Sequence, residues 1–261
     1  MSGRASAKGP FRTVAFDLFD TLVDFDPTRL PEVDTGGKME RTTTRPAYDA
    51  LYEGGYALPH YPAFHLLWLD TSRQVWADRD NDPECREVAS TVRFRRLMDR
   101  MVSIPAAQKD EAAALARESH MEALIGAALF DPARFAMLDR IREGGLRMGV
   151  VTNFDHTPAA HRLLERRGIA PYLDVVLVSE EEGYRKPSPR LFLKAAERLG
   201  AAPGEVLFVG DTFTTDVVGP QKVGMPCAWL NPKGGQVPEG CRPPDFEIRK
   251  VEETLRLLGL C

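Results

Sequence analysis

The sequence predicts an α/β protein in which helices cover a parallel sheet. In the second half of the chain, short apolar runs alternate with amphipathic stretches, as they do when strands and helices follow one another. Three of the amphipathic stretches begin near a proline and stop at a glycine, which is the pattern that helix ends favour. With 261 residues and 43% hydrophobic content, the chain is long enough to bury a sizeable core.

The strands are expected where short apolar runs, several of them rich in valine, lead into polar residues. These runs are residues 13–16, 147–152, 174–178, 205–209 and 227–230. The helices between them are expected at residues 132–143, 158–167 and 189–199. Because each helix separates two strands, the sequence favours parallel pairing of the strands.

Residues 25–130 contain few valine-rich runs and several long helical stretches, so we expect a helical insertion in the α/β core. One of these stretches carries apolar residues on one face and Arg93, Arg96 and Arg100 on another. The apolar face predicts burial. The arginine face predicts a solvated surface, with contact to an anionic substrate as the alternative.

The charge and the cysteines limit the partners that we expect. A net charge of -4 argues against binding to nucleic acid or to an anionic membrane, so an anionic small-molecule substrate must be held locally. Four widely spaced cysteines, without a signal peptide pattern or a long apolar run, favour a cytoplasmic protein with reduced thiols. Residues 1–10 are expected to be a disordered tail, and the sequence allows a monomer or a homodimer.

Residues that can carry chemistry follow the predicted strands at the point where each strand ends. Because the carboxyl ends of parallel strands meet at one edge of a sheet, these side chains are expected to lie close together. The group consists of Asp17, Thr152, Asn153, Lys186, Asp211 and Asp216.

An aspartate beside a lysine and a second carboxylate can attack an electrophilic phosphorus or carbon atom. Oxygens from Asp17 and Asp211, together with a main-chain carbonyl and waters, are a plausible ligand set for Mg²⁺. Lys186 supplies a fixed positive charge, and the Thr152 hydroxyl with nearby amides can donate to the oxygens of a transferred group.

The order of these motifs along the chain resembles that of the haloacid dehalogenase-like hydrolase superfamily. The resemblance rests on Asp17 followed by Thr21, on Thr152-Asn153, on Lys186-Pro187, and on Gly210-Asp211 followed by Asp216. It implies a Rossmann-like core at residues 11–24 and 131–261 with helices on both faces, and an all-helical cap at residues 25–130. It also implies a covalent aspartyl intermediate.

The resemblance assigns a role to each matching residue. Asp17 is implied as the nucleophile, and Lys186 as the second catalytic group. The residues implied to contact substrate are Thr152, Asn153 and Thr21. The implied magnesium ligands are Asp17, Asp211 and the carbonyl of Phe19. Asp216 is implied to have a supporting role.

Phe19 departs from the family pattern, because phosphatases of this family usually place a second aspartate there as the general acid and base. Asp20 comes one residue after the position of this general acid and base. Because side chains on an extended segment alternate between faces, Asp20 is expected to point away from the group on which Asp17 acts. The sequence therefore favours a slow Mg²⁺-dependent phosphatase of a small phosphorylated metabolite. Two alternatives stay open: a metal-independent 2-haloacid dehalogenase that forms an aspartyl ester, and a weakly active or inactive protein that binds a ligand or partner.

Overall fold

The computed structural model describes residues 11–260, so the tail predicted at residues 1–10 lies outside the described residues. The chain divides into two units, which are described separately here. The α/β unit comprises residues 11–24, 130–154 and 164–260, and the helical unit comprises residues 25–129 and 155–163.

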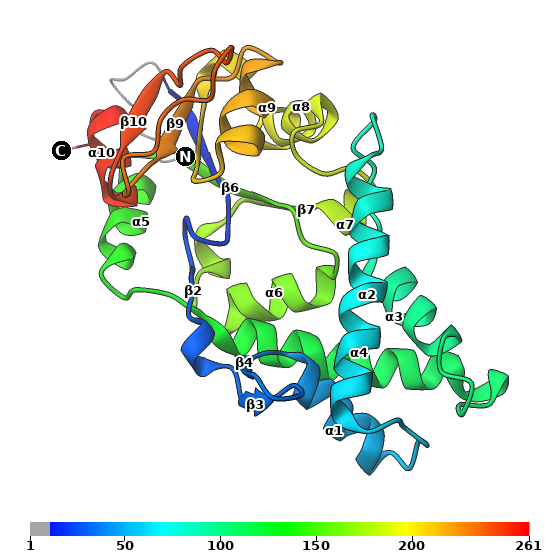
Figure 1. Cartoon of the computed structure of the whole chain (residues 1–261). Helices are drawn as coiled ribbons and strands as arrows, with labels where there is room; N and C mark the ends of the chain where they lie inside the picture. Colours follow the sequence, from blue (N-terminus) through cyan, green and yellow to red (C-terminus); the bar gives the residue numbers. More distant parts are fainter. Residues whose placement is uncertain (1–10, 261) are drawn as a thin grey trace. The chain divides into compact units, whose positions relative to one another are not determined.

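A six-stranded sheet forms the centre of the α/β unit (Figure 1). Its strand order is β10-β9-β8-β1-β6-β7, and every pair of neighbouring strands is parallel. The predicted α/β fold class and five predicted strands are thereby confirmed, the strand bounds to within one residue. The strands are β1 (Thr13–Phe16), β6 (Arg147–Thr152), β7 (Val175–Val178), β8 (Val206–Gly210), β9 (Cys227–Leu230) and β10 (Phe246–Ile248).

Strand β1 is central and lies between β6 and β8, with Phe16 paired to Val150 on one side and Val209 on the other. All four of its residues are buried, as expected for a parallel strand covered on both faces. The carboxyl ends of β1, β6 and β8 are therefore neighbours, and Asp17, Thr152 and Gly210 lie at these ends.

Helices cover both faces of this sheet. Leu191 and Phe192 of α8 pack against Val151 and Leu177 on one face, and α5 lies on the other side of the sheet (Figure 1). This arrangement follows from right-handed crossovers between parallel strands, because the connection changes face where the strand order reverses. The helices of this unit are α5 (Arg134–Glu143), η3 (Ala170–Tyr172), α7 (Ser179–Glu182), α8 (Pro189–Leu199), η4 (Pro203–Glu205), η5 (Phe213–Val217), α9 (Val218–Gln221), η6 (Val251–Glu253) and α10 (Thr254–Leu257).

Four long helices form most of the helical unit: α1 (Thr44–Glu53), α2 (Tyr61–Asp80), α3 (Ser90–Asp99) and α4 (Lys109–Ala127). Short 3₁₀ helices η1 (Pro27–Arg29) and η2 (Ala106–Gln108) precede α1 and α4, and α6 (Thr157–Arg166) runs across the boundary between the units. The four long helices share a buried aromatic core that includes Phe64, Trp68 and Phe94. No helix within residues 11–260 combines the length and the apolar composition that crossing a bilayer requires.

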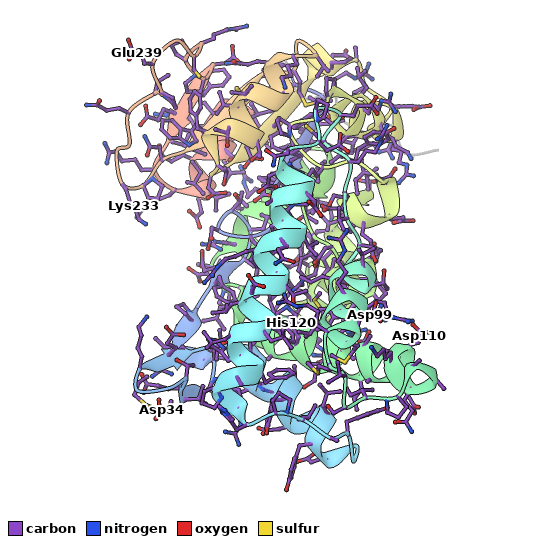
Figure 2. All side chains as sticks on the ribbon, turned by 45° about the vertical axis from the view of Figure 1, so that its right-hand side comes forward. Asp34, Asp99, Asp110, His120, Lys233 and Glu239 are labelled. Carbon is purple, nitrogen blue, oxygen red and sulfur yellow. The ribbon has the colours of Figure 1, made fainter. Side chains whose placement is uncertain are left out.

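The prediction that the inserted segment is all-helical is wrong, because it also contains a hairpin. Strands β3 (Glu32–Asp34) and β4 (Met39–Arg41) pair antiparallel, and β2 (Asp24–Phe25) pairs with β5 (Ala128–Leu129) where the segment begins and ends. The carboxylate of Asp34, labelled in Figure 2, accepts hydrogen bonds from the amides of Gly36 and Gly37. Both glycines have positive φ angles, so this turn needs residues without a side chain.

The predicted arginine face of α3 is only partly solvated. Arg96 and Arg100 pair with aspartates at the surface, but Arg93 is buried and its guanidinium lies 3.0 Å from a carboxylate oxygen of Asp155. The prediction of a solvated arginine at position 93 is therefore wrong. Helical spacing does not show that a segment distant in sequence supplies a partner for a buried charge.

Candidate active site

Asp17 lies directly after the central strand, and the main chain turns sharply behind it. Its amide donates to the carbonyl of Val209 at 2.8 Å, which extends the hydrogen bonding between β1 and β8 by one residue. The amides of Leu22 and Val23 then both donate to the carbonyl of Leu18. Asp20 adopts a left-handed φ of 57° in this turn, a conformation that aspartate tolerates better than most residues do.

Lys186 is held in place through its main chain by Asn153. The side-chain amide of Asn153 donates to the Lys186 carbonyl at 3.0 Å and accepts from the Lys186 amide at 2.7 Å. Because Asn153 follows β6 directly, these two bonds tie the lysine to the carboxyl edge of the sheet. The lysine side chain is 2% exposed, and Nζ lies 2.5 Å from Asp17 Oδ1 and 2.8 Å from Asp216 Oδ1.

The residues that follow β8 carry the other two carboxylates. Asp216 Oδ1 also accepts from the Thr215 hydroxyl, and Oδ2 accepts from the Thr212 amide at 3.1 Å. A Cβ atom at Gly210 would lie 2.5 Å from the Asp216 carboxyl group. Only glycine therefore lets the end of β8 approach this carboxylate closely.

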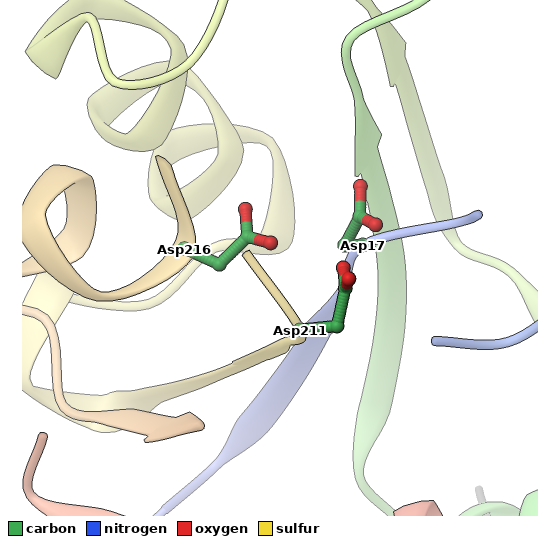
Figure 3. A group of neighbouring side chains, drawn as sticks. All are labelled: Asp17, Asp211 and Asp216. Atoms are coloured by element: carbon green, nitrogen blue, oxygen red, sulfur yellow. The ribbon is translucent and has the colours of Figure 1, made fainter. Parts of the chain in front are cut away.

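Asp17, Asp211 and Asp216 form one cluster, shown in Figure 3. Each offers a carboxylate oxygen, and these oxygens lie within 4.8 Å of one another. Among the described residues, Lys186 is the only cation paired with any of the three. With all four groups ionised, the cluster carries a net charge of -2, which a divalent cation would balance.

Burial and charge repulsion shift the pKa values of these groups. Burial raises the pKa of Asp17 to about 7, and the charge of Asp216 adds to this increase while Lys186 opposes it. Burial, together with the charges of Asp216 and Asp20, raises the pKa of Asp211 to about 6. Burial opposes ionisation of Lys186, but the carboxylates of Asp17 and Asp216 raise its pKa overall. The carboxylates thus carry more negative charge than one lysine offsets.

This donor set fits a hard metal ion. All three side chains offer carboxylate oxygens, the ligands that Mg²⁺ and similar ions prefer. Asp216 already accepts from three donors, whereas the donor to the Asp211 carboxylate within residues 11–260 is the Thr212 hydroxyl, at a long distance of 3.3 Å. Asp17 and Asp211 therefore have the free oxygen lone pairs that a cation would need.

The other predicted site residues lie in the same unit but make different contacts. Thr152 is buried at the end of β6, and the buried Thr21 hydroxyl has no hydrogen-bond partner within residues 11–260. The Phe19 ring packs on Phe154, with the ring centroids 5.3 Å apart. Asn153 binds the main chain of Lys186 as described above. Substrate contacts for Thr21, Thr152 and Asn153, and magnesium ligation by the Phe19 carbonyl, stay predictions.

Sequence reasoning missed two residues that support the site. The Trp229 indole nitrogen donates to the Asp211 carbonyl at 2.8 Å, and the Thr215 hydroxyl donates to Asp216. Thr215 directly precedes Asp216, so a search for local side-chain partners would have found it. Trp229 is 18 residues from Asp211, and the contact depends on the pairing of two strands, which spacing alone does not reveal.

Comparison with known proteins decides the family. The sequence profile of the haloacid dehalogenase-like hydrolases matches residues 11–224. The chain belongs to this family. Asp17 lies at the end of the central strand of this haloacid dehalogenase-like hydrolase, and its role as the nucleophile stays a prediction.

Individual relatives of this haloacid dehalogenase-like hydrolase include named phosphatases. The pyrimidine 5'-nucleotidase YjjG of Escherichia coli (strain K12) is 35% identical over 128 residues, which is 49% of this chain and 56% of that protein. The glyceraldehyde 3-phosphate phosphatase of Methanopyrus kandleri is 36% identical, and the match likewise spans only 52% of it. The phosphoserine phosphatase of Thermus thermophilus is 29% identical over 90% of this chain and 92% of that protein.

Among solved structures, a 2-haloacid dehalogenase from Pseudomonas syringae pv. Tomato DC3000 is similar to this chain over nearly its whole length. The TM-score is 0.69, the sequence identity is 27%, and the match covers 95% of this chain and 98% of that one. The relatives and structures together support hydrolase activity, with phosphatases prominent among the relatives.

Proposed function

We propose that this protein is a Mg²⁺-dependent phosphatase that acts on a small phosphorylated metabolite through an aspartyl-phosphate at Asp17. The observation that carries the proposal is the cluster of Asp17, Asp211 and Asp216 around Lys186, with its net charge of -2. An acid that attacks carbon without a metal does not need two further carboxylates beside it. The net charge of -2 would instead bind a divalent cation, and that cation would hold the phosphate ester.

Lys186 orients the nucleophile. Its ammonium binds Asp17 Oδ1, so Oδ2 is the oxygen that attacks phosphorus and displaces the alcohol oxygen of the ester. The departing alcohol oxygen takes a proton from solvent. Water then attacks the phosphorus of the aspartyl-phosphate and loses a proton to solvent, the bond from phosphorus to Asp17 breaks, and phosphate is released. Asp216 also accepts a hydrogen bond from the Lys186 ammonium and raises its pKa, which keeps the ammonium charged and fixed.

In the proposed site, Asp17, Asp211 and the Phe19 carbonyl hold the Mg²⁺ ion. The ion, when bound, supplies positive charge to the phosphate oxygens. Thr152 is the last residue of the neighbouring strand β6, and in the proposed mechanism its hydroxyl would donate to the same phosphate group.

Phe19 sets the expected rate. It offers no proton to the departing alcohol, and positioned acid catalysis typically contributes about 10²- to 10⁴-fold in rate. The enzyme is therefore expected to be slow on alkyl phosphates and faster on aryl phosphates, whose leaving groups need no proton.

The names of two relatives, the pyrimidine 5'-nucleotidase YjjG and the phosphoserine phosphatase of Thermus thermophilus, support a phosphate ester as the substrate. The net charge of -4 argues against nucleic acid or an anionic membrane as the partner, so a small anionic substrate would have to be held by local charges at the site. We further propose that residues 25–130 form a cap that selects the substrate. We also propose that the protein is cytoplasmic and is a monomer or a homodimer.

A second candidate function is hydrolysis of a 2-haloacid through an aspartyl ester. Two observations favour it: Phe19 is an aromatic residue where phosphatases carry an acid, and the chain is 27% identical to a 2-haloacid dehalogenase across almost its whole length. Halide leaves without a proton, so this reaction tolerates Phe19. The charge of the three-aspartate cluster favours the phosphatase.

The two functions are separated by their products and their metal requirement. Purified protein is assayed for p-nitrophenyl phosphate cleavage and for chloride release from 2-chloropropionate, each with Mg²⁺ and with EDTA. The proposal expects phosphatase activity that needs Mg²⁺ and disappears in Asp17→Asn. Asp139→Asn is the control, because Asp139 lies at the surface of the same unit, where its carboxylate accepts a hydrogen bond from the Tyr172 hydroxyl. Chloride release that persists in EDTA would overturn the phosphatase proposal and support the 2-haloacid dehalogenase instead.

A further inference from the structure

Trp229 connects strand β9 to the peptide group of Asp211. It pairs with Gly210 in the register between β8 and β9, and its side chain is 7% exposed. The indole Nε1 donates to the Asp211 carbonyl at 2.8 Å. A buried indole nitrogen needs an acceptor, and here the acceptor belongs to one of the three clustered aspartates.

Contacts on two sides fix the direction of this indole N–H. The Phe213 ring meets the indole edge-on, with centroids 5.1 Å apart and an interplanar angle of 81°. Gly235 lies beside the indole, where an added Cβ would be 3.6 Å from the ring, an ordinary van der Waals distance. Gly235 is held in turn by Asn231, whose side chain accepts from its amide and donates to its carbonyl, both at 2.8 Å.

The segment from Asp211 to Asp216 is otherwise bonded mainly to itself. The Thr212 carbonyl accepts from the amides of Thr215 and Asp216, and the Thr212 amide donates to the Asp216 carboxylate. The Asp211 carboxylate accepts a long hydrogen bond from the Thr212 hydroxyl, at 3.3 Å. The place of this carboxylate is therefore set by its own main chain, and Trp229 holds that main chain from outside the segment.

We infer that Trp229 is a positioning residue for Asp211, and through it for cation binding at the three-aspartate cluster. The cation part of the inference rests on the proposed function, but the positioning part does not. Removing the N–H should leave the Asp211 carbonyl without its donor and let the segment from Asp211 to Asp216 open more often. The carboxylate would then spend less time in the position that a cation needs.

The test uses two changes at position 229 in the full chain. Trp229→Phe removes the donor and part of the ring, and β-(3-benzothienyl)alanine at the same position keeps the bicyclic shape but replaces the N–H with sulfur. Trp76→Phe is the control, because Trp76 is an exposed residue of α2 in the helical unit. Hydrogen exchange at the amides of residues 212–216 measures positioning in metal-free protein, and calorimetric titration with MgCl₂ measures affinity.

Both changes are expected to speed the exchange of these amides, and to raise the Kd for Mg²⁺, by roughly 3- to 10-fold, as loss of one buried hydrogen bond implies. The control should match the parent in both measurements. Unchanged exchange in the benzothienyl protein would overturn the inference, because Trp229 would then act by packing alone. Faster exchange with an unchanged Kd would overturn its cation part. A parent protein that binds no Mg²⁺ would remove the metal from the proposed function and leave the exchange result to decide positioning.

Discussion

Replacing Asp211 with asparagine should stabilise the metal-free protein while removing one of the proposed cation ligands. The carboxylate is half-buried, it has no cationic partner in the described part of the chain, and its pKa is raised to about 6. A raised pKa means that the folded state favours the protonated acid. The stability that protonated Asp211 gives the folded state is fully present below the ordinary pKa of 3.8. It is lost as the pH rises through about 6, because the buried carboxylate then ionises.

The size of the effect follows from that shift. A difference of about two pKa units corresponds to roughly 3 kcal/mol at pH 8, and solvent screening of a partly exposed group reduces this to about 1–2 kcal/mol. For a protein of this size, the thermal midpoint of Asp211→Asn should lie about 3–6 °C above that of the parent in EDTA at pH 8. The gain should shrink as the pH falls and vanish near pH 4.

Thermal unfolding followed by circular dichroism, with and without MgCl₂, measures both halves of this prediction. Saturating Mg²⁺ should raise the midpoint of the parent and have little effect on the variant, because the ion binds only the folded parent tightly. Asp24→Asn is the matched control: Asp24 pairs with Arg134 at 2.9 Å, so its loss should bring no gain in stability. An Asp211→Asn variant that is no more stable than the parent in EDTA would refute the claim that the site holds excess negative charge.

Three further outcomes are expected. Phe19→Asp should raise kcat on alkyl phosphates by at least about 10-fold and change kcat on aryl phosphates little, because the aspartate supplies a proton to the leaving group. Equal effects on both substrates would contradict the role given to Phe19. Gly210→Ala should reduce phosphatase activity by about 10²-fold or more, because its Cβ would displace the Asp216 carboxylate that holds Lys186; normal kcat in a folded variant would count against that role. Burial, followed by the charges of Arg93 and His156, lowers the pKa of His120. The free energy of unfolding should therefore fall by up to about 1.4 kcal/mol per pH unit below about pH 6.5, and His120→Leu should lose this dependence in denaturant titrations at several pH values.

The strands and helices of the α/β unit were predictable because each leaves a local signal. Valine-rich runs mark β1 and β6, and a proline and a glycine bound α8, so the bounds of all three agree with the structure. Strand β10 has three residues and is only partly buried, so it has no apolar run to mark it. The β3–β4 hairpin depends on a turn at two glycines, which resembles a loop in the sequence.

The candidate site was predictable to the extent that its residues follow strands. Asp17, Lys186, Asp211 and Asp216 do converge, since parallel strands end at a common edge. The partners of each group were not predictable, because they depend on register and on side-chain direction. Asn153 was expected to meet substrate, yet the structure directs both ends of its amide at the main chain of Lys186.

The burial of Lys186 has a practical consequence for labelling experiments. Its ammonium is enclosed by two carboxylates and 2% of the residue meets solvent, whereas lysines such as Lys38 and Lys233 are exposed. Reductive methylation or acylation of the folded protein should therefore modify the surface amines and spare this one. Such treatment, often used to improve crystals, should therefore leave the Lys186 ammonium and its pairing with Asp17 and Asp216 unmodified.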